Sequence, residues 1–153
     1  MRERVLANIE ASANARSVSN FNQLERFETA YGFYRQAGFD ADRTLGHLQG
    51  IDFTQPVFAT ELLPGTNYVQ HVLNGRVGIY FAPLGTPAEM LGINPAGRTP
   101  LVFAPSQPVP ALQSTASRVL DTWTVPSQPF NAAGGGTQFF VPGKGLMIQV
   151  PNP

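Results

Sequence analysis

The chain has 153 residues, 42% of them hydrophobic, which suits a single folded domain, and ten basic residues balance ten acidic ones. This balance excludes a strong net field for holding nucleic acid or an anionic membrane, and no apolar run approaches the roughly 20 residues of a membrane span. The absence of cysteine excludes thiol catalysis and disulfides, and the presence of only two histidines, His47 and His71, excludes a multi-histidine metal site.

Charge density falls near Gly50 and divides the chain into two parts. Residues 1–50 carry six arginines and six acids, whereas residues 51–153 carry four basic and four acidic side chains. We therefore predict an N-terminal helical region over residues 1–50 and a β-rich core over residues 51–153, which together form one compact domain.

Three helices are predicted in the N-terminal part. Residues 2–15 are rich in Ala, Glu and Arg, which favour a helix. The second helix ends at Gly38, and Asp40 begins a short third helix that ends near Gly50. The apolar side chains of the second helix recur every three or four residues and share one face: Phe21, Leu24, Phe27, Tyr31 and Tyr34.

Short β-prone segments separated by turns follow Gly50. Asn74-Gly75 is a strong signal for a two-residue hairpin turn, and one helical turn is expected over residues 88–91. Residues 114–123 are predicted to form a helix, because apolar side chains recur at helical spacing from Leu112 to Trp123. The predicted strands are 57–62, 67–73, 77–81, 101–103, 109–112, 137–141 and 146–150.

The predicted fold class is α+β, with N-terminal helices followed by a small mixed, mostly antiparallel β-sheet core that holds one embedded helix. Standard hydrolytic motifs are missing from the sequence. It has no G-x-S-x-G nucleophile elbow and no glycine-rich phosphate loop, and the carboxylates of the β-rich part show no paired arrangement. Three local features remain as candidates for a functional site.

The first candidate is the run of glycines at residues 134–136, which is followed by Gln138 and Phe139. Three glycines allow the backbone to approach a ligand closely, although a flexible linker before an ordinary strand is the more common explanation.

The second candidate is the pair Ser114 and Thr115. Their hydroxyls can hydrogen-bond a ribose or phosphate, and they are also ordinary helix-capping residues.

The third candidate is the hairpin, where Gln70 or His71 and the guanidinium of Arg76 lie near a sheet end. Aromatic residues beside them are suited to stacking on a planar ring. A structural histidine at position 71 and a solvated arginine at position 76 are the alternative interpretations.

The order of these segments resembles two related toxin families. The tuberculosis necrotizing toxin family, which are NAD glycohydrolases on a reduced ADP-ribosyltransferase-like sheet, shares the layout of residues 63–66, 80–87 and 134–138. The polymorphic toxin type 46 domain, a C-terminal part of secreted bacterial toxins, is more similar still, over about residues 30–142. The segments that carry this second resemblance are 34–38, 47–53, 112–116, 122–123 and 136–140.

The resemblance implies a site that cleaves NAD or NADP. Gln138 matches the glutamine that serves NAD cleavage in the necrotizing-toxin family, and Ser114 with Thr115 resembles a pair that supports the nicotinamide pocket. Gln70 stands near the place where that family has an arginine, so Arg76 or His71 would supply the charge for the pyrophosphate. The implied catalytic residues are Gln138, Gln70 and Arg76, and the implied binding residues are Tyr68, His71, Tyr80, Phe81, Ser114, Thr115, Arg118, Gly136 and Phe139.

The resemblance thus implies a secreted bacterial effector domain that cleaves NAD(P) at the nicotinamide–ribose bond and depletes the target cell. The domain would be the C-terminal part of a larger secreted delivery protein and would act in the cytoplasm of the target cell. Its producer would need a cognate immunity protein. NAD or NADP is the implied substrate, and no prosthetic group, metal or membrane is implied.

Other functions stay open from the residues alone. ADP-ribosyl transfer to a protein or nucleic acid is the main alternative, although the catalytic glutamate of the transferases is missing because no acid follows Asp121. A ribonuclease toxin would use His47, His71, Arg76 and Arg118 as a thin acid–base set. A binding module without enzymatic activity would use the aromatic hairpin as its partner surface.

Overall fold

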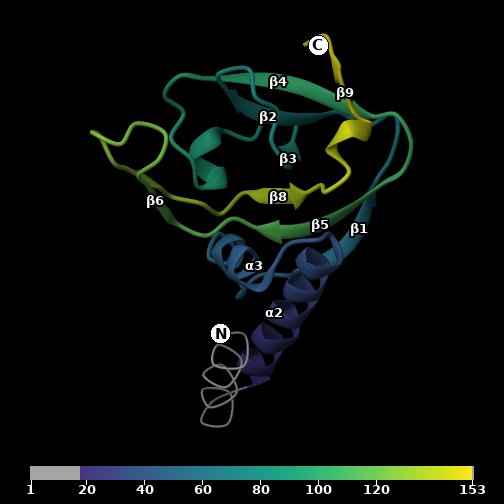
Figure 1. Ribbon diagram of the computed structural model, residues 1–153, viewed down its shortest axis with the longest axis vertical. Helices are drawn as coiled ribbons and strands as arrows, with labels where there is room; N and C mark the ends of the chain where they lie inside the picture. The colour runs from purple at the N-terminus through teal and green to yellow at the C-terminus, as the bar shows by residue number, and fades with distance from the viewer. Residues whose placement is uncertain (1–17, 153) are drawn as a thin grey trace.

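The structure, a computed structural model, describes residues 18–152 (Figure 1), so the helix predicted over residues 2–15 lies outside the described residues. Two α-helices, α2 (Val18–Gln36) and α3 (Ala41–Leu48), precede all the strands. The strands are β1 (Phe58–Leu62), β2 (Tyr68–Leu73), β3 (Tyr80–Pro83), β4 (Arg98–Pro105), β5 (Val109–Thr115), β6 (Val119–Asp121), β7 (Phe130–Ala132), β8 (Thr137–Phe140) and β9 (Met147–Val150). Two 3₁₀ turns, η1 (Ala88–Leu91) and η2 (Lys144–Leu146), interrupt them. The predicted α+β class is confirmed.

Seven strands form one curled sheet in the order β1-β5-β8-β3-β2-β4-β9, and β6 pairs with β7 in a separate ribbon. Every pair in the seven-stranded sheet is antiparallel. Figure 1 shows α2 and α3 beside β1 and β5 at one side of the curl, with β2 and β4 at the other side. None of the described helices is long and apolar enough to cross a membrane.

The helices pack on the sheet through aromatic rings. Tyr34 of α2 is fully buried and stacks on Phe140 of β8, with ring centroids 4.1 Å apart and planes 2° from parallel. Phe27 and Tyr31 are buried on the same face of α2, as the spacing of apolar residues predicts. Phe21, near the beginning of the helix, is instead 52% exposed.

Local signals set the ends of these helices. Gly38 adopts a φ of +98°, which favours glycine, and α2 ends just before it as predicted. The side chain of Asp40 caps α3 by accepting a hydrogen bond from the backbone N–H of Arg43 at 2.7 Å. The chain therefore turns sharply, and the residues that follow α3 reach β5 and β8, where the backbone N–H of Asp52 donates to the carbonyl of Thr115 and the side chain of Gln138 donates to the carbonyl of Gly50.

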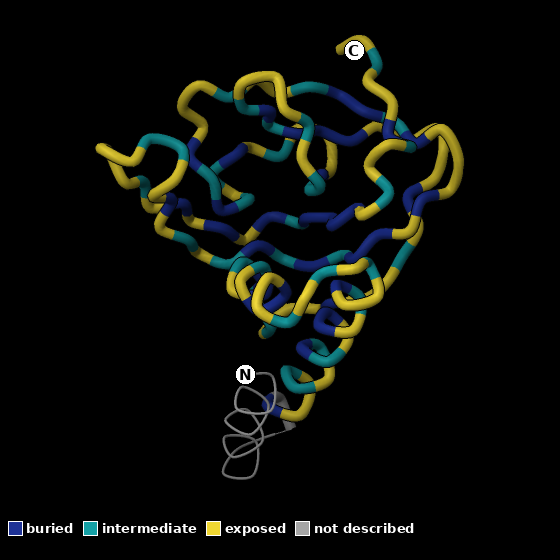
Figure 2. The backbone as a smooth tube through the Cα atoms, viewed as in Figure 1, coloured by how far each residue is buried: buried dark blue, intermediate teal, exposed yellow. Residues whose placement is uncertain are grey.

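A second core lies inside the curl of the sheet. It contains buried aromatic and aliphatic side chains of several strands, among them Phe81, Phe103 and Phe139. Successive side chains of a strand face opposite sides, so Phe139 joins this core whereas its neighbour Phe140 packs against the helices. Figure 2 shows buried segments along β5 and β8 and also along β2 and β4.

The helix predicted over residues 114–123 is wrong. Strand β5 includes Ser114 and Thr115, and β6 begins at Val119. β5 lies between β1 and β8, and both Ala111 and Leu112 are covered although they face opposite sides. A strand that is buried on both faces lacks the alternating pattern, and its apolar residues can fall on helical spacing by coincidence. The embedded helix is instead η1, at the predicted residues 88–91.

Tyr34→Ala is expected to lower the free energy of unfolding by about 3–5 kcal/mol, because it removes a buried ring and leaves a cavity beside Phe140. Tyr34→Phe keeps the ring and loses only a hydrogen bond to the hydroxyl of Tyr80, so a loss of about 1 kcal/mol is expected. Urea unfolding measures both values. Equal losses for the two variants would show that ring packing does not hold the helices on the sheet.

Candidate active site

The hairpin of β2 and β3 opens into a cavity. The predicted turn is confirmed, with positive φ angles of 55° at Asn74 and 71° at Gly75. The predicted partner strand is shorter than expected, because β3 begins only at Tyr80 and pairs with β2 at just two positions. The cavity at this divergence has a volume of about 1140 Å³, which exceeds the roughly 300–1,000 Å³ of small-ligand pockets.

Gln70 of β2 bridges the divergence. Its buried side chain accepts a hydrogen bond from the backbone N–H of Gly78 at 2.7 Å and donates to the carbonyls of Gly78 and Tyr80 at 3.1 and 2.8 Å. The amide thus replaces the ladder hydrogen bonds that the two strands do not make. This bonding gives Gln70 a structural position at the cavity wall, and its implied part in NAD cleavage stays a prediction.

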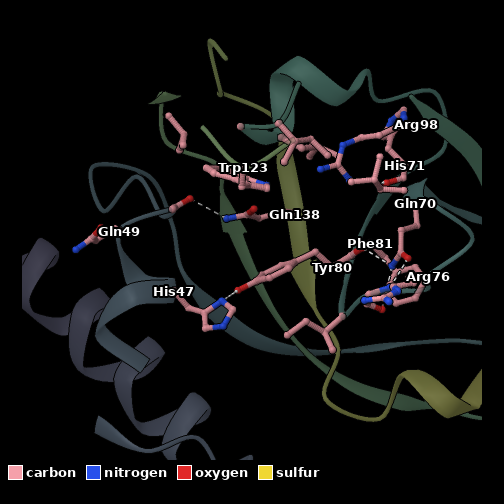
Figure 3. A pocket seen from close by; sticks show the side chains of 18 of the residues that line it. His47, Gln49, Gln70, His71, Arg76, Tyr80, Phe81, Arg98, Trp123 and Gln138 are labelled. Atoms are coloured by element: carbon pink, nitrogen blue, oxygen red, sulfur yellow. Dashed lines mark hydrogen bonds between the residues drawn. The ribbon is translucent and has the colours of Figure 1, made fainter. Parts of the chain in front are cut away.

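Gln138 of β8 is held in one orientation at another wall (Figure 3). Its Nε2 donates to the carbonyl oxygen of Gly50 and to the hydroxyl of Ser114, each at 3.1 Å. A carbonyl can only accept, so the amide nitrogen must be the atom that faces Gly50. Both N–H groups are therefore occupied, and Oε1 remains to accept a hydrogen bond from a ligand.

Ser114 supports Gln138 and does not cap a helix, because the helix predicted over residues 114–123 is not present. The two residues are direct partners in the antiparallel register of β5 and β8. Side chains opposite each other in such a pair lie within contact distance on the same face of the sheet. Ser114 is buried and does not line the cavity, so its hydroxyl contacts the amide of Gln138 and not the cavity itself.

A chain of three polar groups begins at the cavity wall and runs into the core. Nδ1 of His47 lies 2.7 Å from the hydroxyl of Tyr80, which in turn lies 2.6 Å from the hydroxyl of Tyr34. Burial raises the pKa of Tyr80 to about 12, against the lowering effect of Tyr34, and burial also raises the pKa of Tyr34. Burial and the nearby Arg43 lower the pKa of His47. At neutral pH all three side chains are therefore uncharged.

The cavity is lined by basic side chains. Arg76 lies between β2 and β3, and Arg118 lies between β5 and β6. Both are exposed, and neither makes a side-chain hydrogen bond within residues 18–152. Nε2 of His71 donates to the carbonyl of Thr86 at 2.7 Å. No Asp or Glu is found among the described lining residues. The site therefore favours an anionic ligand.

A buried carboxylate anchors the loop beside the cavity. Asp121 is fully buried and accepts hydrogen bonds from the backbone N–H groups of Asn94, Trp123 and Thr124 and from the hydroxyl of Thr124. The guanidinium of Arg98 bonds the same hydroxyl at 2.9 Å and two backbone carbonyls. This network fixes the segment that carries Trp123 at the rim of the cavity.

The structure brings seven of the twelve sequence-predicted residues to the cavity: Gln70, His71, Arg76, Tyr80, Phe81, Arg118 and Gln138. The other five do not line it. Tyr68 and Phe139 lie in the core inside the curl, and strand alternation turns Phe139 away from its neighbour Gln138. Ser114 and Thr115 lie in β5, and Gly136 packs so closely that an added Cβ would lie 2.9 Å from the carbonyl oxygen of Met90. Of the implied aromatic binding residues, only Tyr80 and Phe81 therefore line the cavity.

Sequence reasoning missed three residues of the site: His47, Arg98 and Trp123, all of which line the cavity. The sequence suggests His47 only for ribonuclease chemistry. Its contact with Tyr80 joins residues that are 33 positions apart, and sequence spacing does not indicate it. Trp123 was assigned to the buried face of the wrong helix. Two signals point to Trp123: it is the only tryptophan of the chain, and it lies in the segment 122–123 that carries part of the family resemblance.

The chain is similar to known bacterial toxins. A family model described as bacterial toxin 46 matches residues 7–147. The chain is 34% identical over 138 residues to the NAD(P)(+) glycohydrolase toxin Tse6 of Pseudomonas aeruginosa, which covers 82% of this chain and 32% of that protein. The chain thus spans about a third of that curated relative's length.

Two solved structures are similar. The structure of Tse6 in complex with Tsi6 matches with a TM-score of 0.70 and 27% identity, covering 90% of this chain and all of that one. Rhs1-CT in complex with its cognate immunity protein RhsI1 matches with a TM-score of 0.50 and 18% identity, covering 81% of this chain and 93% of that one. The second likeness is one of fold alone.

Asp121 predicts an acid dependence of stability. Burial by itself would raise the pKa of this carboxyl, but its hydrogen bonds from Asn94, Thr124 and Trp123 outweigh burial and lower the pKa. Since the folded-state pKa lies below the unfolded value near 4, Asp121 stabilises the fold above that pH, and this contribution is lost as the pH falls through the folded-state pKa.

Asp121→Asn is therefore expected to lower the free energy of unfolding by about 1–3 kcal/mol at neutral pH and to lose less stability than the unaltered protein between about pH 5 and about pH 2. Urea unfolding at a series of pH values measures the difference. Two parallel pH curves would contradict the role given to this carboxylate.

Proposed function

The chain belongs to the bacterial toxin 46 family, which confirms the resemblance seen in the sequence, and from this premise we propose that its cavity binds NAD or NADP and hydrolyses the nicotinamide–ribose bond. Support comes from the toxin Tse6, whose name states this activity and whose matching region covers 82% of this chain. The end of α3 and the β-rich part both line the cavity, so we propose that they act as one catalytic domain.

The orientation of the Gln138 amide is the observation that carries the proposal. Oε1 is left as a hydrogen-bond acceptor, and the hydroxyls of the nicotinamide ribose are suitable donors. In the reaction, the electron pair of the broken bond leaves with the nicotinamide nitrogen, which becomes neutral. Positive charge then spreads over the anomeric carbon and the ring oxygen of the ribose, water adds to that carbon, and its proton passes to solvent.

The partial negative charge on Oε1 stabilises this developing positive charge, and the fixed amide holds the ribose without reorganisation. An amide cannot act as a general base at neutral pH, so the rate enhancement that we assign to Gln138 comes from position and electrostatics. The hydrogen bonds that the amide donates to the carbonyl of Gly50 and to the hydroxyl of Ser114 are then as important as the amide itself, because they determine which of its atoms faces the ligand.

Arg76 and Arg118 are proposed to bind the pyrophosphate. Both guanidinium groups are exposed on the cavity, and the planar fork of an arginine suits two phosphate oxygens at once. Arg98 is less suited, since its nitrogens already bond Asn94, His71 and Thr124. Gln70 stands near the position where the necrotizing-toxin family has an arginine. In this chain, Arg76 and Arg118 would supply the positive charge instead.

Hydrolysis is favoured over ADP-ribosyl transfer by the carboxylate-free lining of the cavity within the described residues. Transfer to a macromolecule needs an acceptor that is activated and oriented, and a glutamate performs that role in the transferases that the sequence resembles. A water acceptor needs no such group when the ribose cation is highly reactive. Purified protein should therefore release nicotinamide and ADP-ribose in equal amounts without a cell lysate.

Membership of the toxin family also suggests the partners of the domain and the compartment in which it acts. We propose that the domain is delivered as part of a larger secreted bacterial protein, since the relative Tse6 is about three times longer than the matching region. Its action on NAD or NADP would take place in the cytoplasm of the target cell. The complex of Tse6 with Tsi6 supports a cognate immunity protein as a second partner.

Gln138→Ala is expected to lower kcat/KM for NAD by at least about a hundredfold, because it removes the fixed acceptor at the reacting ribose. The assay is chromatography of nicotinamide released by the purified protein. Gln149→Ala is the matched control, since Gln149 is an exposed glutamine of β9 outside the cavity, and its activity should be unchanged. A folded Gln138→Ala variant with full activity would contradict the proposed role.

Arg76→Ala and Arg118→Ala are each expected to raise KM about tenfold and to change kcat little, because a pyrophosphate contact is made equally in the ground state and the transition state. Arg35→Ala, at an exposed position of α2 away from the cavity, serves as control. Steady-state kinetics separate the two parameters. A fall in kcat at constant KM would move these arginines from binding to catalysis.

A further inference from the structure

A half-exposed aromatic side chain lies at the rim of the cavity. Trp123 is 53% exposed and lines the cavity, and Leu120 beside it is 52% exposed. An exposed indole gives up the burial that normally stabilises so large a ring, and exposed apolar groups around a concave site commonly mark a ligand surface.

The exposure of Trp123 does not result from a loosely held segment. Its backbone N–H is bonded to Asp121 at 3.0 Å, and the next residue, Thr124, is bonded through both its backbone N–H and its hydroxyl. Arg98 ties this hydroxyl to the carbonyl of His71 on β2. A buried, fully bonded anchor therefore carries an exposed ring, which is the arrangement expected of a binding surface that exists before the ligand arrives.

The ring also lies near the proposed reaction centre. Figure 3 shows Trp123 and Gln138 projecting into the same part of the cavity, with Tyr80 on the other side of Gln138. If Gln138 bonds the nicotinamide ribose, the planar group attached to that ribose lies close to the indole. The nicotinamide ring of NAD is flat and positively charged, and both properties favour the face of an indole.

We propose that Trp123 stacks on the nicotinamide ring of the substrate and covers it at the rim of the cavity. This inference rests on the proposed function and extends it by naming the residue that binds the leaving group. The cationic ring of the substrate binds the indole more tightly than neutral nicotinamide does, so the contact strengthens substrate binding and does not hinder release of the product. Trp123 is accordingly a binding residue with its main effect on KM.

The chain offers a direct spectroscopic test, because Trp123 is its only tryptophan. The ligand is a carbocyclic NAD analogue, in which a methylene group replaces the ribose ring oxygen, so that the cationic ring is kept and the bond is not cleaved. ADP-ribose, which lacks the ring, is the comparison ligand, and calorimetry establishes that each ligand binds. The proposal predicts saturable quenching of tryptophan fluorescence by the analogue and none by bound ADP-ribose.

Equal quenching by the two ligands would place the indole on the adenosine half and overturn the proposal, as would binding of the analogue without quenching. These results would leave the proposed function intact if NAD is still cleaved. Failure of both NAD cleavage and analogue binding would instead overturn the proposed function, and this inference with it.

Kinetics give a second test. Trp123→Ala is expected to raise KM for NAD about tenfold while kcat changes less than about twofold, which corresponds to the loss of one stacked ring. Trp123→Phe keeps a flat ring and should show a smaller rise. Phe21→Ala is the matched control, since Phe21 is equally exposed but lies outside the cavity, and it should leave KM unchanged. An unchanged KM in folded Trp123→Ala would overturn the proposal.

Discussion

The arrangement of the site depends on two hydrogen bonds that the Gln138 amide donates. One reaches Gly50, just beyond α3, and the other reaches Ser114 on the neighbouring strand, so a single side chain links the helical part to the centre of the sheet. Because both N–H groups are occupied, the oxygen is directed to the ligand by elimination. A glutamine thereby acquires a fixed polarity that its free side chain does not have.

The fold supplies the position of this amide through two separate cores. Phe140 packs against the helices, Phe139 packs inside the curl, and Gln138 shares the face of Phe140 but lies where the helices end. The divergence of β2 from β3 then leaves space next to it, and Gln70 satisfies the backbone groups that this divergence would otherwise leave unpaired. The strand order therefore determines both how the two cores pack and where the cavity lies.

The sequence predicted the parts of this molecule that local chemistry determines. Asn74-Gly75 marked its turn, Gly38 marked the end of α2, and the glutamine after the glycines was found by its resemblance to known toxins. Residues whose role comes from long-range contact were harder to find. Trp123 was placed on a helix because β5, buried on both faces, lacks an alternating pattern, and Ser114 was assigned to a cap because its partner Gln138 is 24 residues away. His47 meets Tyr80 only after α3 has packed on the sheet.

The central claim is that Gln138 presents Oε1 to the ribose that carries the nicotinamide. The most direct test is a crystal structure of the protein with the carbocyclic NAD analogue at a resolution that defines hydrogen-bond partners. The account predicts Oε1 within about 3 Å of a hydroxyl of that ribose, with Nε2 still bonded to Gly50 and Ser114. An analogue bound with this ribose outside hydrogen-bond reach of Gln138, or with the amide turned so that Nε2 faces it, would contradict the account.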